Sequence, residues 1–183
     1  TIVYGSARAL RTPHLKRRLA FSTVSNLSYI LFALTLMTPG GIVGGMTHMV
    51  YHAFTKITMF CCAGAIIVKS GREYIYELED FGRVMPIVFA TFTVSSFALI
   101  GVPPLGGFAG KWMIAEAAVA SQNPLAYAGI GALILSTLLT TLYMLSIVVR
   151  AYFPVGELDR AALERVHDPA PSMWVPLALL TAA

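Results

Sequence analysis

The sequence predicts an all-α, polytopic transmembrane helical bundle. Of its 183 residues, 57% are hydrophobic and only 12% are charged, whereas a soluble domain carries roughly a quarter charged residues. The mean hydropathy is +0.73. The apolar residues fall in runs long enough to cross a bilayer, which takes about 20 residues per helix. We therefore expect residues 1–183 to form a single transmembrane domain in a lipid bilayer.

Five apolar runs follow one another, separated by polar connectors. The predicted spans cover about residues 19–37, 42–68, 84–120, 125–149 and 173–183. Residues 1–10 fit the end of an earlier membrane helix. Because the chain begins at Thr1 rather than methionine, and stops within an apolar run at Ala183, we expect it to be a piece of a longer protein.

Glycines between residues 40 and 45 lie at the start of the second span. They form two Gly-x-x-x-Gly spacings, which would allow close helix contact if the segment were helical. They also follow a proline, Pro39, and we slightly favour a turn here. The connector at residues 69–83 is expected to be a solvated loop.

The third span is too long for one straight helix. About 35 residues would reach roughly 50 Å, against a hydrocarbon core of roughly 30 Å. Adjacent prolines cannot lie inside an intact helix, and glycines loosen the backbone further. We expect a single crossing by a discontinuous helix, broken near residues 101–107. The residues that predict the break are Gly101, Pro103, Pro104, Gly106 and Gly107.

The basic residues alternate between connectors. Residues 1–18 hold five Lys or Arg, residues 69–83 hold three and residues 150–172 hold three, while residues 38–45 and 121–124 hold none. The positive-inside rule places the three basic connectors on the cytoplasmic side. A single crossing at the third span preserves this alternation. The net charge of +4 is thereby explained without nucleic acid as a partner.

Three ionisable residues in the second span are spaced four apart: His48, His52 and Lys56. On a helix this spacing puts them on one face. Lys56 falls near the middle of the span, where a charge costs at least about 2.5–3.5 kcal/mol and usually marks an ion or proton path. For the histidines, and for His48 above all, hydrogen-bonded packing is an alternative role.

Lys111 follows the predicted break, with no other charged residue within four positions. A broken helix in a membrane frees backbone polar groups, which protein or water must satisfy. Lys111 is therefore expected in a polar cavity rather than against lipid. Lysine suits proton transfer when burial brings its pKa near neutrality, and histidine begins there. We expect Lys56 and Lys111 to form a relay through the membrane interior.

Other ionisable or reactive groups give weaker signals. Lys16 precedes the first span, where an interfacial anchor and a functional role are equally supported. The His48-x-x-x-His52 spacing lacks the glutamate of a zinc protease, since Met49 stands there, so no metal is expected. Cys61 and Cys62 are interpreted as small buried thiols. No haem, flavin or iron–sulfur signature is present, and no cofactor is expected.

Three segments together resemble the antiporter-like subunits of respiratory complex I. Residues 15–26, LKRRLAFSTVSN, resemble the family's Lys-Arg-x-Leu-Ala-Tyr-Ser-Thr-x-Ser-Gln segment. Residues 48–56, HMVYHAFTK, resemble its His-x-x-x-His-Ala-x-x-Lys segment. Residues 101–111, GVPPLGGFAGK, resemble its Gly-x-Pro-Pro-x-x-Gly-Phe-x-x-Lys segment. The family includes the large subunits of multisubunit cation/proton antiporters and of membrane-bound hydrogenases.

The resemblance implies a fold of fourteen or more helices with two inverted five-helix repeats, each containing a broken helix. This chain would supply most of the second repeat. Lys111 is similar to the broken-helix lysine near the proton exit. Lys56, His52 and His48 resemble the central relay, and Lys16 matches a lysine on the cytoplasmic uptake side. Some members carry glutamate at the position of Lys111, so its presence argues against those members.

The favoured function is proton translocation as a subunit of a complex I-like NADH-quinone oxidoreductase, with electron transfer elsewhere in the complex. The alternative is a subunit of a sodium/proton antiporter, driven by ion gradients alone. A structural membrane subunit without an ion path is the third. Each implies other membrane subunits as partners and an integral position in a bacterial or archaeal cell membrane.

Overall fold

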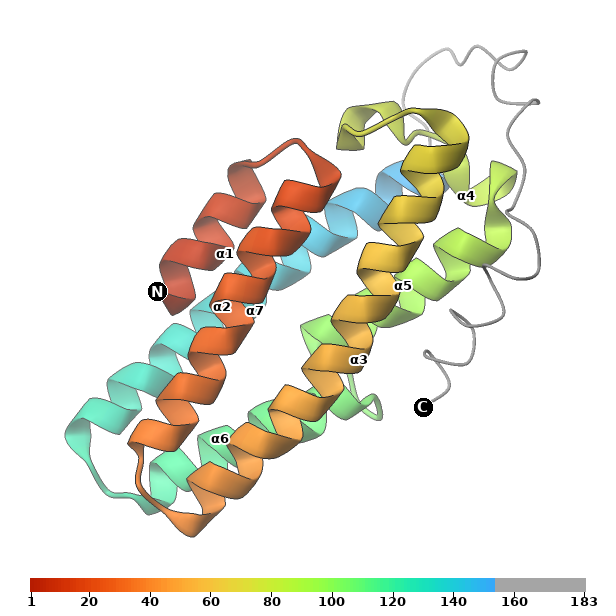
Figure 1. Cartoon of the computed structure of the whole chain (residues 1–183). Helices are drawn as coiled ribbons and strands as arrows, with labels where there is room; N and C mark the ends of the chain where they lie inside the picture. Colours follow the sequence, from red (N-terminus) through yellow and green to blue (C-terminus); the bar gives the residue numbers. More distant parts are fainter. Residues whose placement is uncertain (154–183) are drawn as a thin grey trace.

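The computed structural model describes residues 1–153, and these residues form helices joined by short connections (Figure 1). The prediction of an all-α fold is confirmed. The predicted span at residues 173–183 lies outside the described residues. The elements in chain order are α1 (Ile2–Arg11), α2 (Leu15–Thr35), α3 (Pro39–Ser70), the 3-10 helix η1 (Ile75–Glu77), α4 (Phe81–Val84), α5 (Pro86–Ile100), α6 (Gly106–Ala120) and α7 (Pro124–Tyr152).

Two of these helices, α3 with 32 residues and α7 with 29, are long and apolar enough to cross a membrane. The start of α3 corrects the sequence interpretation, because residues 40–45 lie inside the helix rather than in a turn. Thr38 caps the helix by accepting a hydrogen bond from the Gly41 amide, and Pro39 occupies the first turn. The glycines allow close contact: a Cβ on Gly44 would lie 3.0 Å from the Ile114 amide of α6.

Helix α3 is the centre of the arrangement. It packs against α2, α5 and α6, while α1 packs against α2 and α7 (Figure 1). The two halves α5 and α6 follow one another along α3. The larger core cluster lies between these helices and includes Leu19, Met59, Phe89, Phe92 and Tyr143, all at most 1% exposed.

The α1–α2 connection, η1, α4 and the last turn of α7 lie at one end of the bundle, and the α2–α3 and α6–α7 turns lie at the other (Figure 1). At the first end, the Leu15 amide donates to the Glu73 carbonyl at 2.9 Å, and the Ile75 amide donates to the Pro13 carbonyl at 3.0 Å. Arg150 approaches Glu79 at 4.0 Å. Described residues of all three basic connectors therefore meet at one end.

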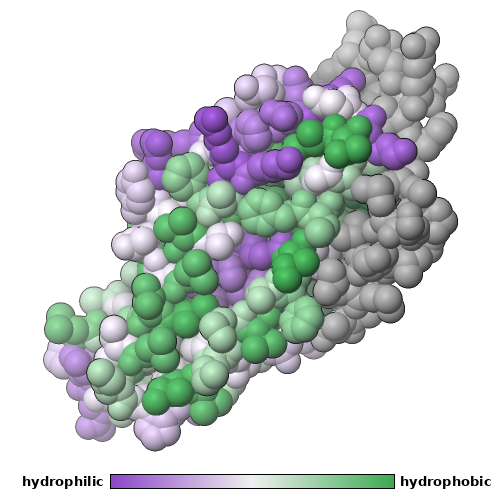
Figure 2. All heavy atoms as spheres, in the orientation of Figure 1, coloured by the Kyte–Doolittle hydropathy of each residue, from purple (hydrophilic) through white to green (hydrophobic). Residues whose placement is uncertain are grey.

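The connector at residues 69–83 is more ordered than the solvated loop we expected. It forms η1 and α4, and it buries Ile75, Leu78 and Phe81 at 4%, 0% and 0% exposure. These apolar side chains seal the end of the core, and their burial stabilises the connector. Figure 2 shows the result: hydrophilic residues gather at this end, while hydrophobic residues dominate the visible faces of α2 and α3.

Candidate functional site

The three ionisable residues of α3 lie on its buried side. His48, His52 and Lys56 are 2%, 6% and 6% exposed. The two imidazole rings stack with centroids 5.9 Å apart and planes 20° apart. Neither ring has a hydrogen-bond partner among the described residues. Successive positions four residues apart rise about 6 Å along a helix, so the row from His48 to Lys56 is about 12 Å long.

Lys56 is held by groups of α2. Its Nζ donates to the Leu19 carbonyl at 3.2 Å and to the Ser22 hydroxyl. The same carbonyl accepts from Ser22 Oγ at 2.8 Å and from Thr23 Oγ1 at 3.0 Å, which explains why α2 carries hydroxyl residues on this turn. No carboxylate pairs with Lys56 within residues 1–153. The ammonium group is thus bound by neutral oxygen atoms.

The helix break falls between α5 and α6. Helix α5 ends at Ile100, and Gly101 follows with φ of 90°, a left-handed conformation that glycine adopts without strain. Pro103 and Pro104 lie in the five-residue turn, and α6 begins at Gly106. The two halves contact each other tightly, because a Cβ on Gly107 would lie 1.8 Å from the Ala98 carbonyl oxygen.

The break creates the binding site of Lys111. This side chain is 6% exposed, and its Nζ donates to the Leu99 carbonyl at 2.8 Å and to the Ile100 carbonyl at 2.9 Å. The last carbonyls of a helix have no partner within the helix, and the helix dipole favours positive charge there. The end of α5 therefore supplies the oxygen atoms that bind the ammonium group.

Tyr29 of α2 lies between the two sets of residues. Its ring centroid is 5.6 Å from that of His48 and 5.7 Å from Lys111 Nζ. The second distance is within the range of a cation–π contact. Helices α3 and α6 also approach closely here, since a Cβ on Gly110 would lie 2.7 Å from the His48 Cα. The ring of Tyr29 thus lies beside both His48 and Lys111. We call Lys56, His52, His48 and Lys111 together the buried row.

A cluster of buried hydroxyls adjoins this row, and the sequence analysis missed it. Tyr29 donates to Ser136 at 2.6 Å, and the Oγ atoms of Ser6, Ser25 and Ser136 are 2.5–2.9 Å apart. Ser25 also contacts the Ile2 carbonyl at 2.8 Å. Four hydroxyl hydrogens are available for these five contacts, so they can fill four of them at one time, and in each of the three serine–serine contacts either hydroxyl can be the donor. The three serines come from α1, α2 and α7, and no short motif joins them.

The structure separates the basic residues at the start of α2. Lys16 is exposed, away from the buried row. Arg18 is instead buried, and it donates to the carbonyls of Thr12, Tyr143 and Leu10 and to the Ser146 hydroxyl. The sequence analysis had counted Arg18 only among the connector charges. Its four bonds fasten the α1–α2 connection to α7.

Four ionisable side chains make up this arrangement. Within residues 1–153 no group of three His, Cys, Asp or Glu side chains could hold a metal ion. Lysine and histidine can each gain and release a proton, and the row brings two of each together. Figure 2 shows a small hydrophilic area between α2 and α3, within an otherwise hydrophobic face.

Known proteins resemble this chain in sequence and in fold. NADH-quinone oxidoreductase subunit L of Rickettsia felis is 33% identical over 182 residues, which cover 100% of this chain and 27% of that protein. A chain of the membrane-bound sulfane sulfur reductase, an archaeal respiratory membrane complex, superposes with a TM-score of 0.87 at 28% identity, over 99% of this chain and 29% of that one.

A chain of the Mrp complex from Dietzia sp. DQ12-45-1b has the same fold, with a TM-score of 0.85 at 23% identity over 100% of this chain and 41% of that chain. The present chain spans about a quarter of the length of the curated relative, 27%. The family model described as NADH:quinone oxidoreductase/Mrp antiporter, transmembrane, matches residues 1–141. The chain therefore belongs to this family of antiporter-like membrane proteins.

Proposed function

We propose that this chain is part of a membrane subunit that translocates protons in a redox-driven respiratory complex. The observation that carries the proposal is the buried row of Lys56, His52, His48 and Lys111, which no carboxylate of the described residues neutralises. Ionisable groups at membrane depth are costly, so a purely structural subunit would do as well with apolar residues in these places.

In this proposal the row moves protons by successive loading and release. Lys56 holds a proton against the Leu19 carbonyl, and Lys111 holds one against the carbonyls of Leu99 and Ile100. The two histidines connect the lysines. Their ring nitrogens are buried without protein partners in the described residues, and such atoms are commonly bridged by water molecules. A proton then passes along imidazole and water rather than through apolar side chains.

The direction of transport in the proposal follows from the charged end of the bundle. The basic connectors that meet there face the cytoplasm by the positive-inside rule. The exposed Lys16 lies in this region and would take up protons from the cytoplasmic side. Helix α6 leads from Lys111 to the opposite end of the bundle, where the proton would leave (Figure 1). Other membrane subunits would couple this movement to electron transfer.

Two findings favour a redox-driven complex over an antiporter driven by ion gradients. The R. felis relative is named as a subunit of NADH-quinone oxidoreductase, and the 28%-identical solved chain belongs to a respiratory complex. A sodium/proton antiporter subunit is the second candidate function, because the family model covers the Mrp antiporters too. In either case the same row would carry the proton.

The test uses the complete complex in sealed vesicles, with proton uptake followed by a fluorescent pH indicator. We expect redox-driven uptake in wild type and a loss of at least tenfold in Lys56→Met. The control Lys69→Met removes an exposed lysine of the same helix and should pump normally. Full pumping by Lys56→Met would show that the row is not the path. Proton uptake that depends on a sodium gradient and needs no electron donor would identify an antiporter.

A further inference from the structure

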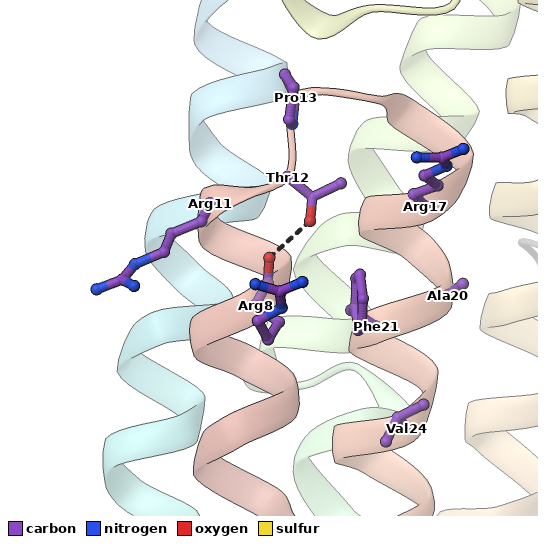
Figure 3. A pocket seen from close by; sticks show the side chains of 8 residues that line it. All are labelled: Arg8, Arg11, Thr12, Pro13, Arg17, Ala20, Phe21 and Val24. Carbon is purple, nitrogen blue, oxygen red and sulfur yellow. Dashed lines mark hydrogen bonds between the residues drawn. The ribbon is translucent and has the colours of Figure 1, made fainter.

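A pocket of about 570 Å³ lies where α1 meets α2, outside the buried row. Arginines of both helices and apolar residues of α2 line it: Arg8, Arg11, Arg17, Ala20, Phe21 and Val24. Figure 3 shows Arg8 beside Phe21 and Arg17 on the preceding turn of α2, while Arg11 extends to the other side of α1. The pocket is at the polar end of the bundle, beside the α1–α2 connection (Figure 3).

The arginines of this pocket have no anionic partner in the protein described by residues 1–153. The ion pairs there join His14 to Glu73, Arg83 to Asp80 and Arg150 to Glu79. Arg18, one residue beyond Arg17, makes four hydrogen bonds, two to the α1–α2 connection and two to α7. Arg8 instead lies 5.6 Å from the centroid of the Phe21 ring, which holds its guanidinium at the pocket without neutralising it.

The apolar side of the pocket continues as a stripe down α2. Val24, Leu27, Leu31 and Leu34 are 44%, 47%, 64% and 40% exposed. Their spacing of three and four residues puts them on one face of the helix. Ten residues of helix rise about 15 Å, which is half of a hydrocarbon core of roughly 30 Å. The stripe therefore matches the depth of one leaflet.

We propose that this pocket and stripe bind an anionic phospholipid. The phosphate lies between the guanidinium groups of Arg8 and Arg17, and one acyl chain lies along the face from Val24 to Leu34. Arginine binds phosphate through paired N–H donors, and basic pockets between membrane helices bind anionic headgroups. An acidic protein segment would satisfy the arginines, but it would give no reason for an aliphatic stripe one leaflet deep.

The test places the complete complex in nanodiscs of phosphatidylcholine. About 1 lipid in 20 is a phosphatidylglycerol that carries a photoactivatable diazirine on one acyl chain. Labelled peptides are mapped by mass spectrometry after illumination. We expect label on the peptide containing Val24 to Leu34. Replacing part of the phosphatidylcholine with unlabelled phosphatidylglycerol should suppress this labelling, whereas the same amount of phosphatidylethanolamine, which has no net charge, should not.

The double substitution Arg8→Gln/Arg17→Gln should lower the labelling by roughly thirtyfold, about fivefold for each charge. The control Lys69→Gln/Arg83→Gln removes the same charge at the same end and should leave it unchanged. Equal competition by both lipids, or unchanged labelling in the arginine variant, would overturn the proposal. So would crosslinking of this face to another protein segment instead of lipid. If the arginine variant fails to assemble, the competition in the unaltered complex decides.

Discussion

Replacing Lys111 with methionine should abolish proton pumping while the subunit still assembles. Methionine fills a similar volume but carries no proton, so the relay would end at His48. In the complete complex in sealed vesicles, we expect Lys111→Met to lose at least nine-tenths of redox-driven proton uptake, roughly a tenfold reduction. Electron transfer measured separately shows whether the complex is intact.

The expected effect on stability is small, because two large contributions oppose each other. The substitution removes two hydrogen bonds from a charged donor, to the carbonyls of Leu99 and Ile100, worth about 1.5–3 kcal/mol each. It also removes a charge whose position at membrane depth costs at least about 2.5–3.5 kcal/mol. The net loss is then about −0.5 to 3.5 kcal/mol, which we expect to be too little to prevent assembly.

Lys111→Arg separates charge from proton exchange. Arginine keeps the positive charge but does not release its proton at accessible pH, so this variant should also fail to pump. The measurement compares both variants with wild type at equal amounts of assembled complex. Normal pumping by Lys111→Met would remove Lys111 from the path. Normal pumping by Lys111→Arg would mean that a fixed charge suffices there, and the proton-exchange mechanism would be wrong.

Two further predictions concern the fold around the site. Gly107→Ala should destabilise the subunit and lower the amount of assembled complex, because its Cβ would lie 1.8 Å from the Ala98 carbonyl oxygen. The control is Gly64→Ala, whose Cβ would have nothing within 4 Å. It should leave the stability unchanged or raise it by up to about 1 kcal/mol. Thermal unfolding of the purified complex compares the two. Arg18→Gln should lower the melting temperature, since it gives up bonds that join the α1–α2 connection to α7, whereas Lys69→Gln, at an exposed position, should not; equal melting temperatures would contradict the fastening role of Arg18.

The parts of the site that follow local rules were predictable from the sequence. A spacing of four residues placed His48, His52 and Lys56 on one helix face before any tertiary contact was known. The proline pair and the excess length predicted a discontinuity, and the structure has α5 end at Ile100 and α6 begin at Gly106. Both inferences need only helix geometry and the chemistry of proline.

The parts that depend on long-range packing were not predictable. Ser6, Ser25 and Ser136 meet only because α1, α2 and α7 pack together, and each serine alone is an ordinary helix residue. Arg18 follows two other basic residues, so its burial has no local signal. Residues 40–45 show a third kind of difficulty, since glycines after a proline fit a turn and a helix start equally well. The Thr38 cap and the approach of α6 decide for the helix.

The way in which the two lysines are bound bears directly on their proposed role. Lys56 and Lys111 each donate to main-chain carbonyls, with a hydroxyl added at Lys56 and the Tyr29 ring near Lys111. A buried carboxylate partner would hold the ammonium by a strong charge–charge attraction, and separating that pair would leave an unpaired charge in a medium of low polarity.

Neutral oxygen atoms bind the ammonium less strongly, and they stay satisfied by water once the proton has left. The break between α5 and α6 supplies such oxygen atoms for Lys111, because the last carbonyls of α5 have no partner within the helix. The discontinuous helix and the lysine beside it are thus one device. The break supplies the oxygen atoms that accept from Lys111, and under the proposed function these neutral acceptors would let its proton leave.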